Sequence, residues 1–173
     1  WDIAIDYYLE AYRVNSMAVK GLEQALQITL ATNKFERAEE ICDLLLEEEP
    51  ENEKYLETLR DLALFDNDFE KALKTIQVLE TTRGPTVELL IQKSALYEEL
   101  DDSENALKEI LKAFGRDSLN SDVLNRLVNL LLNDKQIDRA ENYNQLLIEK
   151  FPDDVRGFIN AGFLALNRNK PED

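Results

Sequence analysis

The stretch FERAEEICDLLLEEEP, residues 35–50, decides the fold of this chain. Its apolar side chains recur three and four residues apart, as at Ala38, Ile41 and Leu45, which places them along one face of a helix. The pattern stops at Pro50, a residue that cannot continue a helical hydrogen-bond ladder. The stretch therefore predicts one amphipathic helix with a defined end.

The same pattern returns along the chain at a fixed interval. Its alanine recurs every 34 residues, at Ala4, Ala38, Ala72, Ala106 and Ala140. A bulky residue lies sixteen positions before each alanine from Ala38 onward and before the place expected for the next one, at Leu22, Leu56, Leu90, Leu124 and Phe158. A third row follows seven positions after the alanine, at Ala11, Leu45, Leu79, Ala113 and Leu147. A period of this length is typical of a stacked-repeat architecture.

Each repeat holds a second apolar stripe upstream of its alanine. In the first whole repeat this stripe is formed by Leu22, Leu26 and Leu30, again with helical spacing. Short segments rich in Asn and Asp separate the two stripes, at 32–34, 66–68, 100–102 and 133–135. Because Asn and Asp tolerate the left-handed backbone that ends many helices, we expect them to adopt it in these turns. Each repeat is thus predicted to be an antiparallel helical hairpin.

These rows resemble the tetratricopeptide (TPR) repeat, whose unit is a helix A, a tight turn and a helix B. The resemblance extends over the whole chain and implies an all-α fold, a right-handed superhelical α-solenoid of antiparallel helix pairs. We expect a single TPR-like array over residues 1–173, cut from a longer protein. Its divisions are a partial repeat at 1–18, whole repeats at 19–52, 53–86, 87–120 and 121–154, and a partial repeat at 155–173.

Composition agrees with helix and limits the partners. The chain has five Gly and four Pro in 173 residues, so few positions break a helix. Its 36 Asp and Glu against 20 Lys and Arg give a formal net charge of −16. Since nucleic-acid binding depends on Lys and Arg at the phosphates, we expect a protein or peptide partner and no nucleic acid.

The sequence indicates neither a membrane span nor a particular compartment. No apolar run reaches the roughly 18 residues that a spanning helix needs. The chain opens at Trp1 without a leader, but a targeting segment could lie upstream, so the cytoplasm is favoured and the periplasm stays open. The single cysteine, Cys42, allows no internal disulfide and is expected in the core.

In TPR proteins helix A lines the concave surface, where ligands lie. Projected onto this chain, the resemblance gives a candidate surface for a peptide or protein: Gln24, Gln27, Phe65, Gln92, Asn125, Arg126, Asn129, Asn133, Asn160 and Phe163. An amide offers both a donor and an acceptor, so a row of Asn and Gln can hold a peptide backbone whatever its side chains. The alternative is that these amides are only solvated, as on many exposed helix faces.

The resemblance also implies a ligand that should not bind. Some TPR domains grip a C-terminal carboxylate with Lys, Asn and Arg on three successive A helices. The matching positions in this chain carry Glu57, Asp61, Gln92, Asp122 and Arg126. Since the carboxylates among them would repel a carboxylate ligand, we expect no binding of acidic C-terminal tails.

No catalytic, metal or cofactor site is predicted. The chain has no histidine, which removes Ser-His-Asp and Cys-His arrangements. It carries neither a Gly-rich phosphate loop nor a dinucleotide fingerprint. Its acidic residues are numerous, but none has the spacing of a calcium loop. We therefore expect a non-enzymatic chain without a cofactor.

Two functions remain. The first is a protein–protein interaction scaffold that binds a peptide or protein partner on its concave helix-A surface. The second is a structural spacer or self-association module within a larger multidomain protein. It is suggested by Phe158, Phe163 and Leu164 in the last helix, which we expect to pack against a neighbouring repeat or a second copy. The sequence carries no signal for the identity of the partner, the pathway or the oligomeric state.

Overall fold

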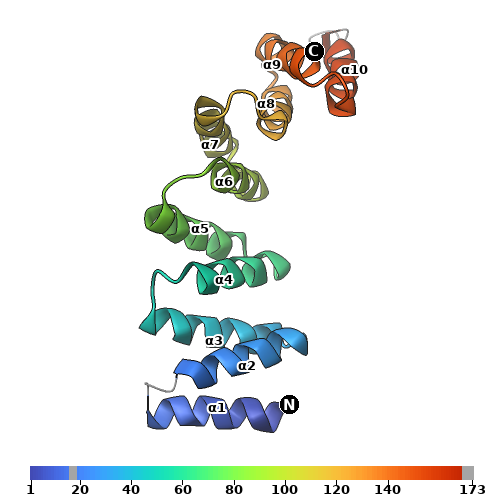
Figure 1. Cartoon of the computed structure of the whole chain (residues 1–173). Coiled ribbons are helices and arrows are strands. Elements are labelled where there is room, and N and C mark those ends of the chain that lie inside the picture. The colour runs from blue at the N-terminus through green and yellow to red at the C-terminus, as the bar shows by residue number, and fades with distance from the viewer. Residues whose placement is uncertain (16–18, 169–173) are drawn as a thin grey trace. The chain divides into compact units, whose positions relative to one another are not determined.

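The computed structural model describes residues 1–15 and 19–168, and all regular structure in these ranges is helical (Figure 1). The chain forms two compact units, Trp1–Gly84 and Pro85–Asp173. The first holds α1 (Asp2–Val14), α2 (Val19–Ala31), α3 (Phe35–Glu48), α4 (Glu53–Phe65) and α5 (Phe69–Arg83). The second holds α6 (Val87–Glu99), α7 (Ser103–Arg116), α8 (Ser121–Asn133), α9 (Ile137–Lys150) and α10 (Val155–Arg168).

Within the first unit each helix packs against the next one along the chain. Consecutive helices run antiparallel because short turns join them, as Figure 1 shows for α2 and α3. The core is built from the apolar stripes predicted above and includes Ile5, Leu22, Ile41 and Leu45, all without exposed surface. Burial of each of these side chains stabilises the unit by roughly 2 kcal/mol.

The second unit repeats this arrangement from α6 to α10. Its last helix, α10, packs against both α8 and α9. The approach to α9 is close enough to require glycine, since a Cβ at Gly157 would lie 2.7 Å from Cγ1 of Ile148. None of the described helices in either unit is long and apolar enough to cross a bilayer.

From Ala38 onward, the alanines of the 34-residue row are buried within the helix pairs. Ala38, Ala72, Ala106 and Ala140 have no exposed surface, and each lies in the first turns of a B helix. The apolar row sixteen residues upstream is also buried from Leu22 to Leu124, whereas Phe158 on α10 is 57% exposed. The all-α fold of helix pairs that the period predicts is therefore confirmed, while the division into one array of repeats stays a prediction.

The turn between helix A and helix B has one geometry in all four hairpins. Its central residue has a positive φ in each case, and these residues are again 34 apart: Asn33, Asn67, Asp101 and Lys135. The next backbone N–H donates to the carbonyl five residues earlier, as Asp102 N to Tyr97 O at 2.8 Å and Gln136 N to Leu131 O at 2.8 Å. This pair of features is the Schellman motif, which satisfies the last carbonyls of helix A.

The expectation that Asn or Asp takes the left-handed conformation is confirmed in three turns and wrong in the fourth. There Lys135 has φ +56°, while Asp134 before it has φ −85°. The 34-residue spacing of the turns determines which position is left-handed, and it overrides the intrinsic preference of Asp134 for that conformation. Lys135 must hold a backbone that costs an ordinary side chain about 1 kcal/mol.

One ion pair lies inside a hairpin of the second unit. Nζ of Lys93 on α6 is 3.4 Å from Oε2 of Glu109 on α7, and both side chains are more than nine-tenths buried. Lys112 on α7 approaches the other oxygen of Glu109 at 2.8 Å. Two charges removed from water stabilise a fold only while they remain paired.

We predict that Lys135→Gly stabilises the second unit by about 1 kcal/mol, because glycine adopts positive φ without steric cost. In thermal unfolding followed by circular dichroism, the midpoint should rise by about 2–4 °C. Lys108→Gly on the exposed face of α7 is the matched control and should lower stability by a similar amount. A fall in the midpoint for Lys135→Gly would contradict the assignment of this turn.

A second prediction concerns the buried pair. Glu109→Leu should lower the free energy of unfolding by about 3 kcal/mol, since Lys93 then keeps its buried position without this carboxylate. The double variant Lys93→Met, Glu109→Leu should regain most of that loss because two apolar side chains fill the same space. Urea unfolding measures both, and equal losses in the single and double variants would show that the pair is not coupled.

Candidate protein-interaction surface

In the first unit, the candidate residues of helix A lie on α2 and α4. Gln24 and Gln27 are exposed on α2, and no hydrogen bond within the described part of the chain engages their side chains. Phe65 ends α4 and is 68% exposed, which is unusual for a large aromatic side chain that a helix could have buried. These three residues therefore face solvent.

In the second unit, the candidate residues are divided between solvent and the interior. Asn129 and Asn133 lie one turn apart on α8 and are exposed, and their side chains have no hydrogen-bond partner among the described residues. Phe163 on α10 is 53% exposed. Gln92 on α6 is half-buried and donates to Oε1 of Glu88 on the same helix at 3.3 Å.

Arg126 joins two A helices of the second unit. Its Nε donates to Oγ of Ser94 at 2.9 Å, and its guanidinium forms an ion pair with Glu98. Both partners lie on α6, whereas Arg126 lies on α8. The positive charge of Arg126, which the sequence predicted would contact a ligand, is thus neutralised by Glu98.

Asn160 and Asn125 form a second link of this kind. Nδ2 of Asn160 on α10 donates to Oδ1 of Asn125 on α8 at 2.9 Å, and Asn160 is only 4% exposed. An amide that is itself buried and bonded to a half-buried neighbour is not available to a peptide backbone. The structure therefore separates the candidate amides into a linking pair and an exposed set.

Sequence reasoning missed the role of repeat-spaced polar pairs. Several hydrogen bonds and ion pairs join residues close to one repeat apart: Arg126 to Ser94, Asn160 to Asn125, Arg156 to Asp122, Tyr55 to Glu23 and Lys71 to Glu39. Pairs at intervals of 32 to 35 residues are visible in the sequence once the period is known. A search for complementary side chains at that interval would have identified Arg126 as a link between helices.

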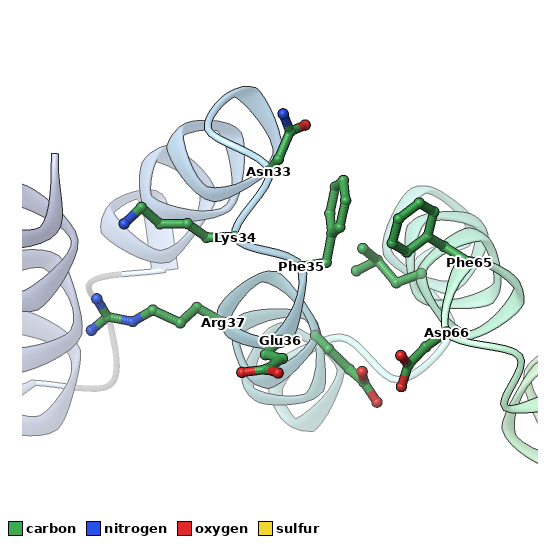
Figure 2. Close-up of a pocket in the computed structure, with 9 residues that line it drawn as sticks. Asn33, Lys34, Phe35, Glu36, Arg37, Phe65 and Asp66 are labelled. Atoms are coloured by element: carbon green, nitrogen blue, oxygen red, sulfur yellow. The ribbon is translucent and has the colours of Figure 1, made fainter.

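A pocket of about 390 Å³ lies in the first unit beside Phe65 (Figure 2). Phe65 contacts Phe35 at the start of α3, with 4.5 Å between the ring centroids and 58° between the ring planes. Leu62 and the acidic residues Glu36, Glu39 and Asp66 also line the pocket. Figure 2 shows the Glu36 and Asp66 carboxylates pointing to the opposite side from the two rings.

Two cations also line this pocket but are bound elsewhere. Nζ of Lys34 is 2.6 Å from Oδ1 of Asp2, and Arg37 pairs with Asp2 and Asp6. The hydrogen bond from Lys34 lowers the pKa of the Asp2 carboxyl and so favours its ionised form. Figure 2 shows both cationic side chains directed away from the aromatic rings.

The thiol of Cys42 and the hydroxyl of Tyr55 both have raised pKa values. Burial raises the pKa of the Cys42 thiol to about 12, so it is protonated at neutral pH. Burial, together with the hydrogen bond to Glu23, raises the pKa of Tyr55 to about 12. In the described part of the chain, no group of three or more Cys, Asp and Glu is placed to hold a metal ion. What the described surface does offer is amides, carboxylates and exposed aromatic rings.

No family model and no curated protein sequence matches this chain. Solved structures match it along most of its length. YrrB, described as a TPR protein with an unusual peptide-binding site, superposes with a TM-score of 0.69 at 16% identity, over 94% of this chain and 84% of that one. A tetratricopeptide repeat protein from Parabacteroides merdae gives a TM-score of 0.76 at 18% identity, over 87% and 60%.

A third structure has the same character. The TPR protein TTC0263 from Thermus thermophilus gives a TM-score of 0.60 at 19% identity, over 95% of this chain and 90% of its own. Identities of this size establish the fold and nothing finer. The chain has the helical-repeat fold of the TPR proteins.

Proposed function

We propose that this chain is a protein-interaction scaffold that holds an extended peptide segment of a partner against the exposed faces of its A helices. The observation that carries the proposal is that each unit exposes two amides on an A helix whose side chains have no partner among the described residues. These are Gln24 and Gln27 in the first unit and Asn129 and Asn133 in the second. Each can donate to and accept from a peptide backbone. Phe65 and Phe163 add exposed rings that can anchor a partner side chain.

The internal links favour the same function. Arg126 joins α8 to α6, and the pair of Asn125 and Asn160 joins α8 to α10. These links hold the backbone of α8, which carries the exposed amides Asn129 and Asn133, in one position. A surface held in one conformation loses less entropy when it binds. In this proposal these three residues position the surface and do not contact the peptide.

The proposed mode of action is binding without catalysis. The chain lacks histidine, and its one thiol is protonated and buried. Its net charge of −16 disfavours nucleic acid and acidic tails and favours a partner that is neutral or basic. The peptide-binding site named for YrrB supports a peptide as the ligand class, because that protein shares the fold.

The second candidate is a structural or self-associating module, and a separate observation favours it. Both outer helices carry exposed apolar side chains: Trp1, Ile3 and Tyr7 on or beside α1, and Phe158, Ile159 and Leu166 on α10. Such side chains are suited to packing against another repeat or another copy. A mass that rises with concentration in light scattering, together with the absence of peptide binding, would favour this function over the first.

Peptides selected against the chain from a random display library provide the test. For a selected peptide, Asn129→Ala with Asn133→Ala should raise the Kd about tenfold, because two hydrogen bonds of roughly 0.5–1.5 kcal/mol each are lost. Fluorescence polarisation with a labelled peptide measures the change.

The matched control replaces two exposed amides on helix B, Asn142→Ala with Gln145→Ala on α9. It should change the Kd less than twofold. If the α9 pair weakens binding as much as the α8 pair, or if no peptide is selected at all, the assignment of the helix-A surface is wrong.

A further inference from the structure

We infer that the pocket beside Phe65 binds an arginine side chain of the partner, so that the scaffold selects basic segments. The inference rests on the proposed function and adds a chemical class to it. It concerns a site formed entirely within the first unit, by the turn before α3 and the end of α4.

The wall of the pocket suits a planar cation. Phe35 supports Phe65 at 4.5 Å, yet 68% of Phe65 stays exposed, so ring surface is left for a ligand. A guanidinium stacks on such a ring through its flat face, with attraction to the electron-rich ring surface. Leu62 lies beside the rings and can contact the aliphatic stem of the same side chain.

The charge at the rim is negative once the internal pairs are considered. Both cations that line the pocket are paired with α1 carboxylates, and Glu39 is paired with Lys71 at 2.5 Å. Glu36 and Asp66 remain, and neither carboxylate has a partner in the part of the chain that the structure describes. Two carboxylates that line the same pocket as an exposed ring attract a cation and repel an anion.

The same groups argue against other occupants. An apolar side chain would cover Phe65 but would also take water from Glu36 and Asp66 without replacing its hydrogen bonds. Lysine would gain the charge attraction, but its ammonium has no flat face to stack on a ring. Arginine combines a planar face that stacks on the ring with a positive charge that the carboxylates of the pocket attract.

The location of the pocket fits the proposed peptide path. Phe65 is the last residue of an A helix, and Gln24 and Gln27 lie on the preceding A helix of the same unit. A peptide held by the exposed amides of α2 therefore has a side-chain pocket on the next A helix. Main-chain contacts of this kind supply affinity, and pockets supply specificity.

The test uses a probe smaller than any peptide. N-acetyl-arginine methylamide is titrated into the full chain carrying ring-labelled Phe, and the ring signals are followed by NMR. The Phe65 and Phe35 signals should shift with a Kd on the order of 1 mM. The citrulline counterpart has the same shape without the charge and should bind at least about tenfold more weakly.

Two variants assign the contacts. Phe65→Leu keeps an apolar side chain but removes the ring face, and Asp66→Asn removes one charge; each should weaken arginine binding about threefold or more. Both positions are exposed, so folding is retained, which circular dichroism verifies. Glu47→Gln, at the other end of α3, is the matched charge control and should leave the Kd unchanged.

The outcomes distinguish this inference from the proposed function. Equal shifts with arginine and citrulline, no shift with either, or shifts confined to the Phe residues of the second unit would each overturn the arginine site. Display peptides that still depend on Asn129 and Asn133 would then leave the scaffold function standing. Loss of peptide binding with a retained arginine site would overturn the scaffold surface on α8 instead.

Discussion

The burial of a single methyl group in the first turns of each of the B helices α3, α5, α7 and α9 is the constraint on which the rest of this structure depends. At Ala38, Ala72, Ala106 and Ala140 the side chain is a single methyl group with no exposed surface. A small side chain at this place lets two helices pack with their larger residues interleaved around it. The left-handed turn before each alanine fixes the direction of the returning helix, and its 34-residue spacing repeats the alanine spacing.

Polar side chains then tie one hairpin to the next. Tyr55 reaches Glu23, Arg126 reaches Ser94 and Asn160 reaches Asn125, each across about one repeat. These contacts are hydrogen bonds at the edge of an apolar core, so they set the orientation of neighbouring A helices more than their stability. The amides left exposed beside them form the surface that we propose for a partner.

The sequence was sufficient for the helices and insufficient for the surface. The positions of the helices follow from the spacing of apolar residues and from the period that five alanines share. Both can be found in the sequence without knowing which residues are in contact. The sequence also predicted the left-handed residue of a turn where that residue is Asn or Asp. Lys135 shows that the 34-residue spacing of the turns decides which position is left-handed, even against the preference of the neighbouring Asp for that conformation. The surface depends on which polar groups find partners, and Arg126 and Asn160 found theirs on neighbouring helices. Helical periodicity assigns a residue to a face but does not tell whether another side chain reaches it.

The alanine contact can be tested by urea unfolding of four single variants, Ala38→Leu, Ala72→Leu, Ala106→Leu and Ala140→Leu. Each should lower the free energy of unfolding by about 1–3 kcal/mol, because three added carbons must fit at a position with no exposed surface. Ala31→Leu, at an exposed position on α2, should change it by less than about 0.5 kcal/mol. If the four variants unfold at the same urea concentration as Ala31→Leu, the alanines do not set the packing of the helices, and the account given for this fold is wrong.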